Sequence, residues 1–140
     1  MISQTAEYAL RAIVCLAQNP EKPQTTVEIA KVTKVPEHYL SKVLHALTKG
    51  EIIRSQRGLH GGYILSHAVD QLPLLGIINA VDPIKQIVSC PLKLSTHGTR
   101  LCALHKKINH SIKLMEDVFK NSTVQTILDE PTQSIPLCES

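Results

Sequence analysis

The first twenty residues place apolar and polar positions with the period of an amphipathic helix. Apolar side chains recur at helical spacing between Ser3 and Gln18, and Asn19-Pro20 follows where such a helix would end. The apolar positions are Ala9, Leu10, Ile13, Leu16 and Ala17. The pattern therefore predicts a first helix over residues 3–18, with one side directed into a core.

Two shorter helices are predicted between Thr25 and Gly50. Thr25 stands three residues before Glu28, the spacing of a capping box, and this helix runs to about Thr33. The next helix begins near Pro36 and ends before Gly50. Its apolar stripe is Leu40, Val43, Leu44 and Leu47, and its polar side is His38, Ser41, Lys42, His45 and Lys49. Two short helices of this kind, the second with a polar and basic outer side, describe a helix-turn-helix.

After Gly50 the helical period gives way to two short β-prone runs, residues 52–54 and 63–65. The segment SQRGLHGG between them is rich in turn residues, which predicts a hairpin with a basic tip. Arg57 at such a tip is well placed to enter a DNA minor groove. In an ordinary loop, the glycines would serve only the turn. The predicted fold class is mainly α, a winged helix-turn-helix with a small β-hairpin wing.

The second half of the chain predicts a short helix that ends at Asp82-Pro83, then a loop, then a long helix from Thr99 to about Asn121. The long helix has apolar positions at steps of three and four, namely Leu101, Leu104, Ile108, Ile112, Met115 and Phe119. About 22 residues span roughly 33 Å, longer than a core of this size needs. We therefore interpret it as a dimerisation helix, with packing against its own domain as the alternative.

These elements divide the chain into four parts. A winged helix-turn-helix domain is predicted over 1–67, and a connecting helix with a Cys/His loop over 68–98. The dimerisation helix and a short C-terminal helix follow over 99–130, and a disordered tail over 131–140.

Composition narrows the class of protein. Hydrophobic residues make up 43% of the 140 residues and aromatic residues only 3%, so the core is aliphatic, which suits packed helices. No apolar run approaches about eighteen residues, and no basic leader precedes an apolar segment. We therefore expect a cytoplasmic protein in a reducing compartment, where closely spaced cysteines bind metal more often than they form disulfides.

The positive charge lies in the predicted helix-turn-helix half. Residues 1–67 hold eight Lys and Arg against five acids, whereas residues 68–140 hold seven against seven. This distribution suits a face that binds a polyanion. A dimeric winged helix would bind double-stranded, pseudo-palindromic DNA. The expected contacts are His38, Ser41 and Lys42 at base edges and phosphates, and Tyr39 at a phosphate.

Three stretches together resemble the Rrf2 family of bacterial transcriptional regulators, in particular members of the IscR and NsrR type. They are EYALRAIVCLA, IAKVTKVPEHYLSKVLHALTKGEIIRSQRGLHGGYIL, and the cysteine-bearing loop before the long helix. The likeness covers roughly residues 1–121. It implies a homodimer with crossing long helices and assigns DNA contacts to His38, Tyr39, Ser41, Lys42, Ser55, Arg57 and Gly58.

The resemblance also implies an iron–sulfur cluster in the loop CPLKLSTHGTRLCALH, residues 90–105. Cluster-binding members carry three cysteines there. Cys90 and Cys102 match the outer two, and Thr96 stands at the middle position. In IscR-like members a histidine at the position of His105 is a ligand. In others, an acidic residue of the opposite subunit serves, at the position of Glu7.

A [2Fe–2S] cluster needs four protein ligands, and mixed Cys/His sites exist. The implied set is Cys90, Cys102 and His105, with His97 or the partner subunit's Glu7 as the fourth ligand. The resulting hypothesis is a DNA-binding repressor whose affinity for DNA is controlled by this cluster.

Other interpretations of the loop remain open. A regulator of the same fold without a cluster would respond to thiol oxidation of Cys90 and Cys102, to a small molecule or to a partner protein, and a Cys₂His₂ zinc site is a further alternative. Cys15 lies on the apolar side of the first helix and is expected in the core, and Cys138 in the tail is expected to have no structural role. Cys102 with His105 lacks an orienting third group, so no enzyme is expected.

Overall fold

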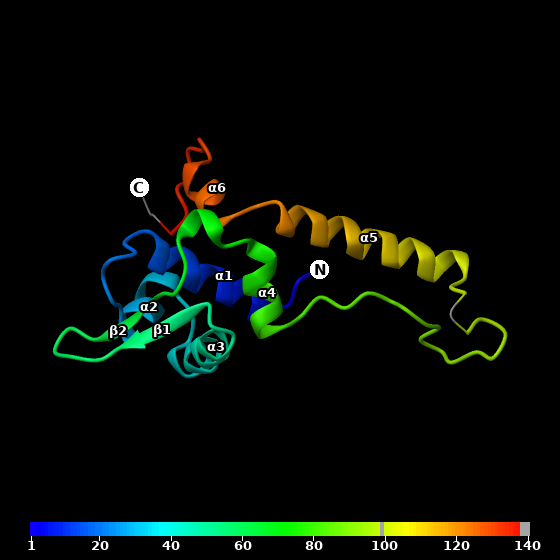
Figure 1. Cartoon of the computed structure of the whole chain (residues 1–140), viewed down its shortest axis with the longest axis horizontal. Coiled ribbons are helices and arrows are strands. Elements are labelled where there is room, and N and C mark those ends of the chain that lie inside the picture. The colour runs from blue at the N-terminus through cyan, green and yellow to red at the C-terminus, as the bar shows by residue number, and fades with distance from the viewer. Residues whose placement is uncertain (99, 138–140) are drawn as a thin grey trace.

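The computed structural model describes residues 1–98 and 100–137 (Figure 1). The elements are α1 (Gln4–Ala17), α2 (Thr26–Thr33), α3 (Glu37–Lys49), β1 (Ile53–Gln56), β2 (Gly62–Leu65), the 3-10 turn η1 (Val69–Gln71), α4 (Leu74–Val81), α5 (Ala103–Lys120) and α6 (Val124–Asp129). All of these except α5 form one body, and α5 projects from it (Figure 1). The connection between α4 and α5 runs beside α5 to its far end.

Helix α1 lies at the centre of the body and packs against α2, α3 and α4. Its start is capped by Ser3, whose Oγ accepts a hydrogen bond of 3.1 Å from the N–H of Ala6. Ala9, Ala12 and Ile13 are completely buried. Two alanines on this face let the neighbouring helices approach closely, and the core around them is aliphatic, as the composition predicts.

The helix-turn-helix is confirmed, including its capping box. The Glu28 N–H donates to Thr25 Oγ1 over 3.2 Å, and the Thr25 N–H donates to Glu28 Oε2 over 2.8 Å. The Thr25 N–H bond holds the pKa of Glu28 below its usual value. The hydrogen bond to the Glu28 carboxylate is therefore at full strength above the usual pKa and weakens as the pH falls through the lowered pKa, whereas the bond to Thr25 Oγ1 does not involve the carboxylate. Helix α3 starts after Pro36, and Gly50 follows its last residue.

The predicted wing is an antiparallel hairpin of β1 and β2, with Ser55 opposite Tyr63. A third segment extends this pairing, because Gln24 and Tyr63 exchange two backbone hydrogen bonds. The wing is thereby tied to the loop that precedes the helix-turn-helix. Its position relative to α3 is set by backbone pairing as well as by the core.

Gly62 makes this pairing sterically possible. Its φ is +156°, and a Cβ there would lie 2.5 Å from the carbonyl carbon of Gln24. We expect Gly62→Ala to lower the free energy of unfolding by about 1–3 kcal/mol, measured by urea denaturation. Gly76→Ala is the matched control, since nothing lies within 4 Å of its Cβ position, and it should raise stability by up to about 1 kcal/mol. Equal effects of the two substitutions would contradict the tight approach.

Helices α4 and α6 close the body on the side from which α5 leaves. The Leu74 N–H donates to the Ser122 carbonyl over 2.9 Å, and the Val124 N–H donates to the Leu72 carbonyl over 3.0 Å. Val124 is completely buried. The C-terminal end of α5 is therefore anchored to the body, while its N-terminal end is distant (Figure 1).

Helix α5 begins at Ala103, later than the predicted start at Thr99, a residue outside the described part of the chain. The apolar residues of α5 lie on two faces. Ile112, Met115 and Phe119 are partly buried and turned toward the body, with Phe119 against the core. The outer face of α5, defined here as Leu104, Leu114 and Val118, is 53–64% exposed, whereas Ile108 lines the same hollow as Ile112 and Met115.

The segment after α6 lies against the body as far as residue 137. The Gln18 side-chain amide donates to the Pro136 carbonyl over 2.7 Å, and Leu137 packs against the core. The tail was expected to be disordered, whereas these contacts hold it to the body up to this point. Cys138 lies outside the described residues. None of the described helices is long and apolar enough to cross a membrane.

Candidate functional site

The outer side of α3 presents polar and basic side chains to solvent. His38, Ser41 and Lys42 are exposed, whereas the opposite side of the helix is completely buried at Leu40 and Leu44. The hydroxyl of Ser41 donates to the Glu37 carbonyl over 3.1 Å, and its oxygen can still accept a hydrogen bond from a ligand. Core packing therefore orients these three residues outward from a rigid helix.

Tyr39 lies in a different environment from the other candidate contacts on α3. Its hydroxyl is 2.5 Å from Thr5 Oγ1, and its ring packs edge-on against Tyr8 with 5.4 Å between the centroids. The ring joins α3 to α1. In this structure the hydroxyl predicted to touch a phosphate bonds to α1, so we assign Tyr39 first to the orientation of α3.

The tip of the wing carries Arg57 and Gly58, both exposed, next to Ser55 on β1. Gly58 has a φ of +134°, which favours glycine, and its carbonyl accepts a 3.1 Å hydrogen bond from the Gly61 N–H. Leu59 beside them is 96% exposed. The sequence pattern did not single out Leu59, because an apolar residue in a turn carries no periodic signal.

The basic side chains of this surface are not engaged within the protein. Among the described residues, the single ion pair joins Arg11 to Glu7, at 2.8 Å, and it lies on α1. Lys42, Lys49 and Arg57 are thus available to an external anion. Lysine and arginine on α3 and the wing tip are the side-chain types that bind DNA phosphates and base edges.

The Cys/His loop forms two separate pairs of candidate ligands. Cys90 is buried, and its Sγ lies 3.7 Å from His97 Nδ1. Cys102, at the N-cap of α5, has its Sγ 3.3 Å from His105 Nδ1. A 3.1 Å hydrogen bond from the Cys90 N–H to the Gly98 carbonyl closes the turn that brings His97 back to Cys90.

The geometry of each pair fits two ligands on one metal ion. With metal–sulfur and metal–nitrogen bonds of about 2.3 and 2.0 Å, the S and N atoms of a tetrahedral site lie about 3.5 Å apart. Both pairs lie close to this separation. The described residues contain no group of three or more candidate metal ligands, however. The structure therefore brings the predicted ligands together two by two, and not as one set of four.

Glu7, the other candidate for the fourth ligand, lies elsewhere. Glu7 is on α1, bound to Arg11, whose Nη1 also donates to the Thr33 carbonyl over 3.2 Å. Thr96 is exposed. Within one subunit, the candidate fourth ligand that lies next to a cysteine is thus His97.

Cys15 is buried in the core, as predicted. Its Sγ donates to Gln24 Oε1 over 3.3 Å, and burial raises the pKa of the thiol. A raised thiol pKa disfavours the reactive thiolate. Cys15 is therefore a packing residue and no candidate for redox chemistry.

Comparison with known proteins identifies the family. The model of the Rrf2 family, described as an iron-dependent transcriptional regulator, matches residues 2–130. An HTH-type transcriptional regulator described from Aquifex aeolicus (strain VF5) is 31% identical over 132 residues, which cover 92% of each chain.

Two solved structures show that the fold is shared. IscR of T. potens superposes with a TM-score of 0.75 at 24% identity, covering 96% of this chain and 91% of that chain. CymR, the global cysteine regulator of B. subtilis, gives a TM-score of 0.73 at 24% identity, covering 89% and 93%. The family consists of DNA-binding transcriptional regulators and not of enzymes. On the match over residues 2–130 and the 31% identity, the chain belongs to the Rrf2 family of transcriptional regulators.

Proposed function

We propose that this protein is a homodimeric repressor that binds a pseudo-palindromic operator in double-stranded DNA. The observation that carries this proposal is the exposed, unpaired basic surface formed by α3 and the wing tip. The N-terminal half of α3 enters the major groove, where His38, Ser41 and Lys42 meet base edges and phosphates. Arg57 enters the adjacent minor groove, and Ser55 and Gly58 approach the phosphate backbone.

A gel-shift experiment tests this proposal on the DNA upstream of the protein's own coding region. We expect one retarded complex, with two subunits per fragment, whose affinity falls steeply with salt. Equal affinity for an unrelated fragment of the same length would contradict operator recognition.

The outer face of α5 supports a dimer. Its three apolar residues are exposed on a helix that extends beyond the body, and such a face is stabilised by a second copy of itself. The polar residues Lys107 and Ser111 lie along the same face, where they would remain in contact with water at the edge of the interface. A two-fold dimer would place two α3 helices on the two half-sites of an operator.

Leu114→Glu should disrupt this dimer. The side chain is 53% exposed in one subunit, and the symmetric interface would bury it twice. Burial of a leucine contributes about 1.5–3 kcal/mol, so loss at two sites should raise the dimer dissociation constant by at least about 100-fold. Light scattering after size exclusion at micromolar protein measures the change. Lys106→Glu, exposed on α5 outside the outer face, is the control, and a dimeric Leu114→Glu variant would exclude this interface.

Control of DNA binding is assigned to the Cys/His loop. Cys90 with His97 and Cys102 with His105 would each supply two ligands, the number that one iron of a [2Fe–2S] cluster requires. The partner subunit's Glu7 remains the alternative to His97. When bound, a cluster supplies one-electron redox chemistry and a fixed cross-link of the loop. The chain's own part is to hold two thiolates and two imidazoles next to the start of α5.

Hydrogen bonds join the segment that leads into the Cys/His loop to the dimerisation helix α5. The Ile87 N–H donates to Asn109 Oδ1 over 2.8 Å, and the Gln86 amide donates to Glu116 Oε2 over 2.9 Å. A change at Cys90 or Cys102 would therefore alter the position of α5, and with it the spacing of the two α3 helices.

A cluster-free regulator is the second candidate, favoured by the separation of the two Cys–His pairs. Cys90 and Cys102 are free thiols in this structure. A thiolate beside an imidazole is the arrangement that promotes oxidation. In this version, thiol oxidation, a small molecule or a partner protein changes the loop and the DNA affinity.

A further inference from the structure

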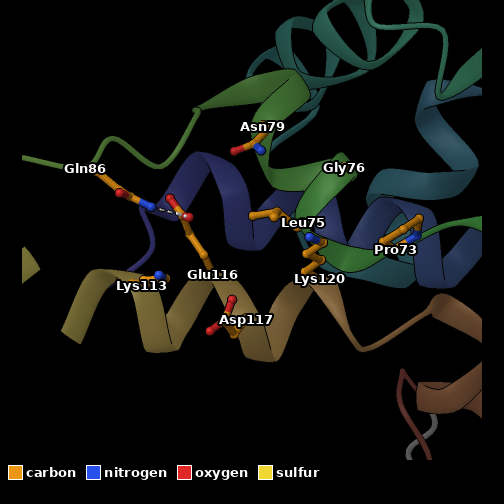
Figure 2. Close-up of a pocket in the computed structure, with 9 residues that line it drawn as sticks. All are labelled: Pro73, Leu75, Gly76, Asn79, Gln86, Lys113, Glu116, Asp117 and Lys120. Atoms are coloured by element: carbon orange, nitrogen blue, oxygen red, sulfur yellow. Dashed lines mark hydrogen bonds between the residues drawn. The ribbon is translucent and has the colours of Figure 1, made fainter. Parts of the chain in front are cut away.

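A hollow of about 490 Å³ lies between α4, α5 and the connection that follows α4. Figure 2 shows side chains from all three segments directed toward it. Its volume is within the range of about 300–1,000 Å³ that is usual for small-molecule sites. The DNA-binding surface and the two Cys–His pairs do not contribute to it.

The walls of this hollow carry both signs of charge. Helix α5 supplies Lys113 and Lys120 together with Glu116 and Asp117. These residues are spaced at three and four positions along the helix, at which opposite charges commonly pair. None of them forms an ion pair in the described structure, where the single ion pair is on α1. Two cations and two anions thus face the hollow without neutralising one another directly.

The remaining walls are apolar or carry amide groups. Asn79 Oδ1 accepts a 3.1 Å hydrogen bond from the Ile84 N–H, so its amide N–H groups remain available as donors. The Gln86 amide donates to Glu116, which leaves Gln86 Oε1 as an acceptor. Pro73 and Leu75 form an apolar side (Figure 2). Donors, acceptors and apolar surface therefore converge on one small volume.

We propose that this hollow binds a zwitterionic small molecule of amino-acid to dipeptide size. The carboxylate would contact Lys120 or Lys113, the ammonium would contact Asp117 and Glu116, and an aliphatic side chain would lie on Leu75. A simple anion would bring charge of one sign to a site whose lining is balanced. The proposal specifies the ligand of the cluster-free regulator that responds to a small molecule. The effect of the ligand on DNA binding rests on that proposed function.

The position of the hollow explains how such a ligand acts on DNA binding. Helix α4 also packs against α3, with Ala80 Cβ only 2.9 Å from the position of a Cβ on Gly50, the residue that ends α3. Gln86 belongs to the connection that leads to Cys90. A ligand that bridges α4 and α5 therefore fixes the angle between the DNA-binding body and the dimerisation helix.

The test uses the full-length protein and pools of the twenty common amino acids and of simple dipeptides, screened by thermal shift and then titrated individually by calorimetry. We expect at least one zwitterion to bind and to change operator affinity. The corresponding amine and the corresponding keto acid should each bind at least about tenfold more weakly, because each lacks one charged contact. Lys120→Gln and Asp117→Asn should weaken binding similarly, whereas Lys106→Gln, away from the hollow, should not.

Three results would overturn the proposal. They are the absence of binding by every pool, binding of the keto acid as tightly as the amino acid, and binding that survives both substitutions in the hollow. Operator binding without any added ligand is measured in parallel. Failure of that measurement would count against the DNA-binding proposal, and success together with no ligand binding would count against the hollow alone.

Discussion

Arg57→Ala is expected to weaken operator binding by about 100-fold. Arg57 is exposed at the wing tip, makes no ion pair in the described structure, and is the residue that we propose enters the minor groove. A specific arginine contact contributes about 1–3 kcal/mol. A dimer makes this contact twice on one operator, so the loss reaches about 2.7 kcal/mol even near the lower end of that range. Fluorescence anisotropy with labelled operator at fixed salt measures the change.

The salt dependence of operator binding distinguishes the role of Lys42 from that of Arg57. Lys42→Ala would remove the proposed phosphate contact from each subunit, so it should reduce the slope of log K against log salt by about 2 and weaken binding to all sequences alike. Lys106→Ala, exposed on α5, should leave both quantities unchanged. If Arg57→Ala binds the operator as tightly as the wild type while remaining a folded dimer, the wing does not contact DNA.

The winged helix was predictable because its local patterns agree with its tertiary contacts. The capping box of Thr25 and Glu28 defines the start of α2 within four residues, and Gly50 marks the end of α3. Gly62, where the chain passes close to Gln24, lies in the turn-rich segment that predicts the hairpin. Each element is specified by neighbours along the chain, so the order of elements follows from sequence.

The faces of α5 could not be assigned in this way. Apolar residues follow two adjacent stripes of the helix, and periodicity does not tell which stripe faces the body. Ile112 and Met115 turn inward because α6 anchors the end of α5 beside α4. The exposed stripe through Leu114 and Val118 is interrupted by Ser111, which hides it from a pattern search.

Contacts across the chain also determine the details of the site. Tyr39 meets Thr5 from a distance of 34 residues, so its orienting role has no local signal. The sequence places four candidate ligands in the loop 90–105, but their division into Cys90 with His97 and Cys102 with His105 depends on the loop's own turns.

Cys90→Ser and Cys102→Ser are each expected to abolish iron binding by protein purified without oxygen. Each removes the thiolate from one Cys–His pair, and a hydroxyl is a poor iron ligand. His105→Ala should lower the iron content strongly. His97→Ala should do so more than Glu7→Gln, because His97 lies beside Cys90 whereas Glu7 is bound to Arg11. Iron and acid-labile sulfide per dimer are the measured quantities.

Two variants control this series. Ser95→Ala changes an exposed loop residue that supplies no candidate ligand and should retain the iron of the wild type. Thr96→Cys adds a thiolate between the two pairs and should retain iron at least as well. Undiminished iron in the Cys90 and Cys102 variants would exclude these residues as ligands.

The most direct test of the central claim compares operator binding by the same protein before and after removal of iron. Protein is purified without oxygen, its visible spectrum, iron and sulfide are recorded, and a portion is treated with a chelator. We expect about two iron and two sulfide per cluster and a change in operator affinity of at least about tenfold on removal. A colourless, iron-free protein that binds the operator with one unchanging affinity would contradict cluster control and leave the thiol, small-molecule or partner-protein mechanism.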